Sequence, residues 1–158
     1  MSRSAARYGL LVALAMVLSW LESLFPLPAA LPGMKLGLTN LVVLFALYRM
    51  GPRPAAAVSL ARVLLVSMTF GNAYSLAYSL AGAAASLALM LLLKRAGTFS
   101  ILGVSVAGGV GHNLGQILVA AAVLGLGALW YLPALLVSGV LAGAAVGAAG
   151  AIVIKRIK

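Results

Sequence analysis

The chain has 158 residues, of which 65% are hydrophobic and 8% are charged, and its mean hydropathy is +1.20. Soluble domains are roughly 45–50% apolar and about 25% charged, so this composition excludes a soluble monomer and equally a disordered chain. Eleven Lys and Arg residues stand against one acid, Glu22, with no aspartate or cysteine. The lack of cysteine excludes thiol chemistry, and a single carboxylate argues against a magnesium site.

About six membrane-spanning helices are predicted, because one span needs about 20 mostly apolar residues. They fall at residues 8–27, 35–50, 54–70, 74–93, 100–124 and 131–154. The segment LPAALPG at 27–33 separates the first two, and a glycine-rich connection at 125–128 precedes the last. The predicted fold class is an all-α integral membrane protein, a compact bundle that forms a single transmembrane domain over residues 1–158. The first helix is expected to be retained, because the remaining chain is just as apolar as this segment.

Basic residues predict the orientation of this bundle. Nine of the eleven fall on one face when the helices alternate in direction: Arg3, Arg7, Arg49, Arg53, Lys94, Arg95, Lys155, Arg156 and Lys158. An excess of Lys and Arg marks the cytoplasmic side of a membrane protein and need not indicate a nucleic-acid partner. We therefore expect a multi-pass protein of the bacterial inner or plasma membrane with both termini in the cytoplasm.

Small residues form a stripe on one face of the first predicted helix. Ala5, Gly9 and Ala13 recur at four-residue intervals, with Ala15 and Ser19 one step round the helix. Small side chains let helices approach closely in lipid. Similar stripes in the fifth and sixth helices are expected to serve packing within the chain. The first helix, at the chain terminus, is better placed to contact another subunit.

Arg62 lies in the middle of the third predicted helix, where an arginine costs about 2.5–3.5 kcal/mol on insertion scales. It therefore requires a partner or a hydrated cavity. Glu22 is the sole acid available, and an Arg62–Glu22 pair is one interpretation. The alternative is that one or both residues bind a ligand.

A second polar cluster lies in the fifth predicted helix. His112 and Gln116 share one helical face, and Asn113 lies beside them. Hydrogen bonds between helices would explain the cluster, but each contributes only about 0.6 kcal/mol in membranes. Three adjacent polar residues therefore favour a lined cavity. A single histidine is a weak signal for a metal site.

Other candidates belong to the outer half of the predicted bundle. Lys35, Thr39 and Asn40 begin the second helix, and Asn72 occupies the turn before the fourth. Lys35 could instead reach the lipid interface, and turn chemistry alone would explain Asn72. The charged residues there are Lys35, Arg62 and Glu22, so the net charge of this region is positive and favours an anionic ligand. The planar guanidinium of an arginine binds such an anion through two parallel N–H groups, like a fork. Trp20 and Tyr78 are expected to form apolar walls of the cavity.

Three segments carry a resemblance to a known family. They are PGMKLGLTNLVVLFALY at 32–48, RVLLVSMTFGNAYSLAYSLAGAAASL at 62–87 and GVSVAGGVGHNLGQILVA at 103–120, with KLGLTN and GHNLGQ the most specific motifs. Over residues 8–154 the chain resembles the bacterial family labelled heptaprenyl diphosphate synthase component I, also called the Gx transporter family. That family is similar to the substrate-binding S components of energy-coupling factor (ECF) transporters.

The resemblance implies a six-helix protein that captures a small nutrient from outside the cell. It implies two kinds of partner, a transmembrane coupling protein and a pair of cytoplasmic ATPases. The small-residue face of the first helix contacts the coupling protein in S components, which here points to Ala5, Gly9 and Ala13, and more loosely to Ala15 and Ser19.

The enzyme-like label of the family conflicts with the residues. All-trans prenyl diphosphate synthases hold magnesium with aspartate-rich motifs, and this chain has no aspartate. It also has no G-x-x-x-x-G-K-[ST] phosphate loop. We therefore expect no enzymatic activity and no cofactor. The predicted function is capture of a small anionic substrate for an ECF-type transporter; the alternatives are a membrane accessory of isoprenoid or quinone metabolism and a stand-alone ion-coupled carrier.

Overall fold

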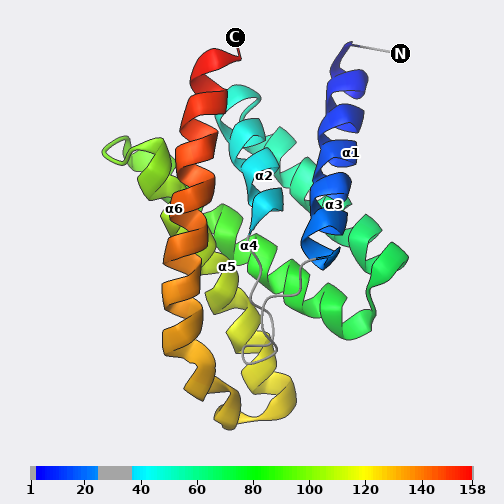
Figure 1. Ribbon diagram of the computed structural model, residues 1–158, viewed down its shortest axis with the longest axis vertical. Helices are drawn as coiled ribbons and strands as arrows, with labels where there is room; N and C mark the ends of the chain where they lie inside the picture. Colours follow the sequence, from blue (N-terminus) through cyan, green and yellow to red (C-terminus); the bar gives the residue numbers. More distant parts are fainter. Residues whose placement is uncertain (1–2, 25–36, 158) are drawn as a thin grey trace.

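The computed structural model describes residues 3–24 and 37–157, and this part of the chain is helical throughout, without strands (Figure 1). The elements in order are α1 (Arg3–Leu24), α2 (Leu38–Arg49), α3 (Pro52–Phe70), α4 (Ala73–Ala96), α5 (Ile101–Leu124), the 3-10 helix η1 (Leu126–Tyr131) and α6 (Leu132–Arg156). Successive α-helices alternate in direction, so the start of α1 and the end of α6 lie at the same end of the molecule. The predicted all-α class with six helices is confirmed.

The length of α2 and the connection between α5 and α6 differ from the prediction. Helix α2 has only 12 residues and begins after Gly37, whose left-handed backbone (φ +74°) makes the bend before the helix. The expected loop at 125–128 is mostly helical, since η1 joins α5 to α6 there. The LPAALPG segment and Lys35 lie outside the described residues.

Within residues 3–24 and 37–157, four segments are long and apolar enough to cross a membrane, namely 5–24, 73–96, 101–124 and 126–156, whereas about six spans were predicted. Their lengths and compositions indicate a membrane protein. Helix α2 is a shorter apolar helix. Twelve residues rise about 18 Å, whereas a bilayer core is about 30 Å thick, so α2 is too short to span it alone.

Small residues bring α4, α5 and α6 into close contact. A Cβ added to Gly109 would lie 2.3 Å from the carbonyl oxygen of Gly139, and one added to Gly115 would lie 2.3 Å from that of Ala81. Backbones meet at these points, and only hydrogen atoms fit between them. The stripes in α5 and α6 therefore pack within the chain, as predicted.

Basic side chains join the helix ends near the chain termini. Arg49 donates hydrogen bonds to the carbonyl oxygens of Ile154, at 2.5 Å, and Ile157, at the end of α6. Lys94 donates to the carbonyl oxygen of Leu47, at 2.5 Å, near the end of α2. The last carbonyls of a helix have no partner within it and carry partial negative charge, so cations stabilise these ends.

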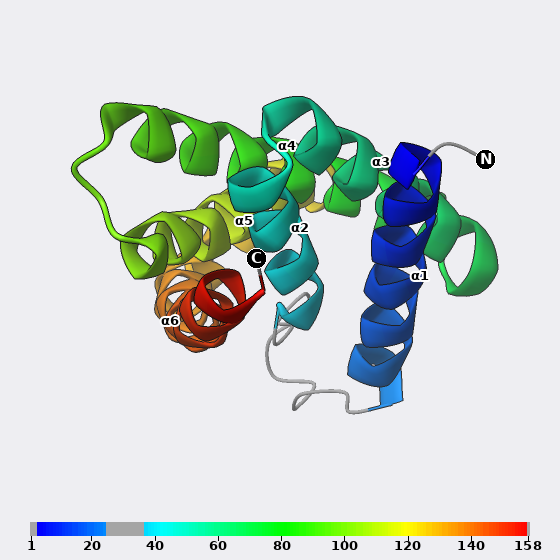
Figure 2. The ribbon, with the colours of Figure 1, turned by 90° about the horizontal axis from the view of Figure 1, so that it is seen from above.

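Helix α1 lies on one flank of the bundle and, within the described structure, packs against α2 and α3 (Figure 2). Ala5, Gly9 and Ala13 are exposed, and a Cβ added to Gly9 would meet no atom within 4 Å. Two residues of the expected partner surface lie elsewhere. Ala15 is fully buried in the core, and Ser19 is turned inward toward Thr39. The exposed part of the predicted surface is thus narrower than expected, because these two positions fall on the inward side of α1.

Candidate ligand-binding cavity

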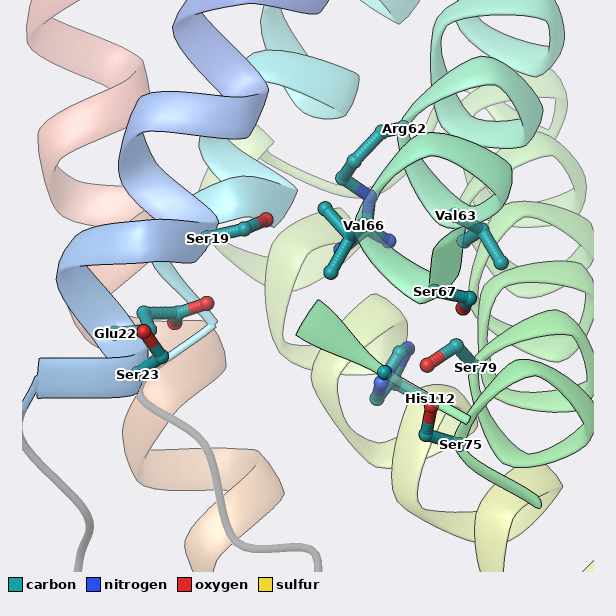
Figure 3. A pocket seen from close by; sticks show the side chains of 11 residues that line it. Ser19, Glu22, Ser23, Arg62, Val63, Val66, Ser67, Ser75, Ser79 and His112 are labelled. Atoms are coloured by element: carbon teal, nitrogen blue, oxygen red, sulfur yellow. The ribbon is translucent and has the colours of Figure 1, made fainter. Parts of the chain in front are cut away.

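A polar cavity of about 170 Å³ lies among α1, α3, α4 and α5 (Figure 3). Eight of its eleven lining residues have polar side chains, although the bundle around it is apolar. The lining residues are Ser19, Glu22, Ser23, Arg62, Val63, Val66, Ser67, Gly71, Ser75, Ser79 and His112.

A second cavity of about 30 Å³, roughly the volume of one water molecule, adjoins the first. Glu22, Arg62 and His112 line both cavities. The remaining lining residues of the smaller one are Gly37, Thr39, Asn40, Gly109, Asn113, Gly139 and Ala142. The structure therefore brings together five predicted site residues from four helices around one polar region.

Glu22 binds the beginning of α2. One carboxylate oxygen accepts a hydrogen bond from the backbone N–H of Leu38 at 2.7 Å, and the other accepts from the Thr39 hydroxyl at 3.0 Å. Ser19 extends this chain, since its hydroxyl lies 3.1 Å from that of Thr39. Gly37 precedes α2 and has no side chain to cap it. Glu22 supplies from α1 both the missing acceptor and the negative charge that a helix N-terminus favours.

Arg62 does not form the predicted ion pair with Glu22. Both carboxylate oxygens of Glu22 are engaged at α2, and the Nε and Nη2 atoms of Arg62 are closed to solvent without a hydrogen-bond partner in the described part of the chain. Desolvating unpaired guanidinium nitrogens is costly. The described residues therefore contain no direct ion pair between Arg62 and Glu22, although Glu22 still acts on Arg62 through its charge.

The polar residues of α5 separate into different environments. His112 lines both cavities, and the absence of a Cβ at Gly82 makes room for it, since an added Cβ would lie 2.9 Å from Cε1 of the imidazole. Asn113 lines the smaller cavity and donates to the carbonyl oxygen of Leu135 at 2.6 Å, tying α5 to α6. Gln116 is 7% exposed, and its Oε1 has no partner among the described residues, yet it lines neither cavity.

Three other predicted site residues are not among the lining residues of either cavity. Trp20 is 48% exposed, and Tyr78, although half-buried, is absent from both walls, so neither forms the expected apolar wall. Asn72 caps α4, because its Oδ1 accepts from the backbone N–H of Ser75 at 2.9 Å and its own N–H donates to the Ser75 hydroxyl. Turn chemistry therefore explains Asn72.

The serines of the wall were missed as site residues, apart from Ser19, which was assigned to a partner surface. Ser19 and Ser23 on α1, and Ser75 and Ser79 on α4, each repeat after four residues, which places both members of a pair on one helix face. That spacing was the available signal. It is weak, because a membrane serine can satisfy itself on its own helix, as Ser23 does with the carbonyl oxygen of Trp20 at 2.6 Å.

The fold and the cavity together indicate an all-helical membrane protein with a cavity of mostly polar lining residues that include an arginine. The chain belongs to the family described as heptaprenyl diphosphate synthase component I, whose model matches residues 11–153. This confirms the resemblance inferred from the sequence motifs. No curated protein and no solved structure matches the chain. The family description names a synthase component, so it leaves the transport role as a proposal.

Proposed function

We propose that this protein is the membrane-embedded substrate-binding subunit of an ECF-type uptake transporter. The observation that carries the proposal is the hydroxyl-lined cavity at Arg62, whose guanidinium has unpartnered nitrogens inside an apolar bundle. Ionisable groups within a membrane are expensive to retain, and they commonly mark substrate pathways. A polar ligand held between α1, α3, α4 and α5 would supply the partner that no described side chain provides.

The energy for uptake would come from partner proteins, because the chain has no phosphate-loop motif of its own. The exposed small-residue face of α1 is the surface we assign to the coupling protein. At Gly9 a helix of another protein could approach closely, since an added Cβ meets nothing within 4 Å.

The family description favours a second candidate, a membrane accessory of prenyl diphosphate synthesis. The cavity argues against storage of the whole product inside this chain. Drug-sized ligands occupy about 300–1,000 Å³, and a heptaprenyl chain of about 35 carbons is at least that large, whereas the main cavity measures about 170 Å³. An accessory role would therefore require lipid-facing binding of the prenyl chain.

Co-purification from native membranes tests both candidates. A tagged chain is expected to recover a transmembrane coupling protein with two ATPases, and replacement of Gly9 and Ala13 by Leu should abolish that recovery. Gly127→Leu is the matched control, because Gly127 is also exposed and an added Cβ there also meets no atom within 4 Å. Recovery of a soluble prenyl diphosphate synthase without ATPases would establish the second candidate. Transport by the isolated chain in liposomes would instead reveal a stand-alone carrier.

A further inference from the structure

We infer that the cavity binds a small hydroxylated organic acid as a monoanion, with its carboxylate on the guanidinium of Arg62. This inference rests on the proposed function, because it names the substrate class of the same site. It is carried by three features of the described residues, namely the unpartnered edge of Arg62, the charges already engaged around it, and the size and hydroxyl content of the wall.

The edge of Arg62 has the geometry that a carboxylate requires. Nε and Nη2 are neighbouring nitrogens of one planar guanidinium, and both lack a hydrogen-bond partner among the described residues. Two parallel N–H groups on such an edge bind the two oxygens of one carboxylate. Both nitrogens are closed to solvent, and Arg62 lines the main cavity, so a carboxylate that reaches this edge from the cavity would supply both missing partners.

The charges of the described wall favour a ligand with one negative charge over a ligand with two. Glu22 accepts hydrogen bonds from the N-terminus of α2 and the Thr39 hydroxyl, and these bonds leave its negative charge in place. Arg62 and Glu22 are therefore one positive and one negative group among the described lining residues. A carboxylate bound at Arg62 adds one further negative charge. A phosphate monoester carries about −1.5 to −2 at pH 7, and its excess charge would face the carboxylate of Glu22 in a region of low dielectric constant.

The wall also limits the size of the ligand and predicts its other groups. An engineered protein cavity of about 150 Å³ holds benzene, so about 170 Å³ accommodates on the order of seven non-hydrogen atoms. Figure 3 shows the hydroxyls of Ser67 and Ser79 across the cavity from Glu22 and Ser23. Hydroxyl groups both donate and accept hydrogen bonds, and therefore match hydroxyl groups of a ligand.

Binding of matched small molecules to the isolated chain in nanodiscs tests the inference. The probes are glycerate and threonate, their neutral amides, glycerol, and glycerol 3-phosphate. We expect at least one acid to bind 10–100-fold more tightly than its own amide, since a charge-assisted contact contributes about 1.5–3 kcal/mol. Glycerol and glycerol 3-phosphate should bind more weakly than that acid.

Variants then assign the effect to Arg62. Arg62→Lys should remove most of the preference for the acid over its amide, because an ammonium keeps the charge but cannot form the fork. Arg53→Lys is the matched control, since Arg53 belongs to the same helix but is exposed and lines neither cavity. The comparison of acid and amide on the unmodified chain needs no variant, so it stands even where Arg62→Lys does not fold.

Three results would overturn the inference: equal affinity for acid and amide, tighter binding of glycerol 3-phosphate than of either acid, or no binding by any probe. These outcomes are independent of the proposed transport role. Affinity is measured without coupling protein or ATPases, whereas co-purification is scored without ligand. A chain that recovers an ATPase pair but prefers no acid would refute only the substrate class.

Discussion

The hydrogen bonds from α2 to Glu22 predict that this residue stabilises the fold through α2 and not through Arg62. Glu22→Gln keeps the length of the side chain but leaves one carbonyl oxygen where two carboxylate oxygens accept from Leu38 and Thr39. Loss of one charge-assisted hydrogen bond costs about 1.5–3 kcal/mol, and loss of the charge at the helix N-terminus costs about 0.3–1 kcal/mol. The expected decrease in the free energy of unfolding is about 2–4 kcal/mol.

Denaturant unfolding of the purified protein in mixed micelles measures this difference. Glu22→Ala should destabilise more than Glu22→Gln, because the N–H of Leu38 then loses its acceptor altogether. Ser23→Ala is the control on the same helix turn, since its hydroxyl bonds only the carbonyl oxygen of Trp20 on its own helix among the described residues. The control should change stability by no more than about 0.5 kcal/mol.

A double-mutant cycle with Arg62 separates the observed arrangement from a buried ion pair. A buried pair can often be replaced by apolar residues, so Glu22→Leu combined with Arg62→Leu would regain the stability lost in Glu22→Leu alone. The hydrogen bonds to α2 predict no such rescue, because Arg62→Leu does not restore an acceptor for Leu38. Full recovery in the double variant would refute the capping role of Glu22.

Three further predictions concern packing, the cavity and topology. In the same unfolding assay, Gly109→Ala should destabilise the protein by about 3 kcal/mol or prevent folding, since its Cβ would lie 2.3 Å from the carbonyl oxygen of Gly139. Gly103→Ala is the control and should have little effect, because its Cβ would lie 3.6 Å from the nearest atom. Gly82→Ala should displace His112, 2.9 Å from the added Cβ, and weaken binding of the preferred acid about tenfold; unchanged affinity would show that His112 does not border the ligand. A reporter fused after the last residue should read as cytoplasmic, and an extracytoplasmic signal would reverse the assigned orientation.

Much of the fold follows from the sequence because its signals are local. Runs of apolar residues predict the six helices, and the four-residue spacing of glycines predicts the close packing of α5 and α6. The position of Arg62 within an apolar helix marks it as the residue that needs explaining. The short α2 was less predictable, since the left-handed backbone of Gly37 makes the helix begin later than the apolar run predicts.

The sequence by itself determined the helical class, the family and the residues whose burial in a membrane requires a partner. Only the tertiary structure decided which partner each one has. Glu22 could reach Arg62 or the start of α2, and the fold places its two oxygens at Leu38 and Thr39. The fold also brings serines of α1, α3 and α4 together in the wall of the main cavity. These residues are far apart in the chain and meet only because the helices pack against one another. A buried polar group requires compensation, which the amino-acid sequence reveals, but the direction and distance of each hydrogen bond depend on helix positions that local patterns do not specify.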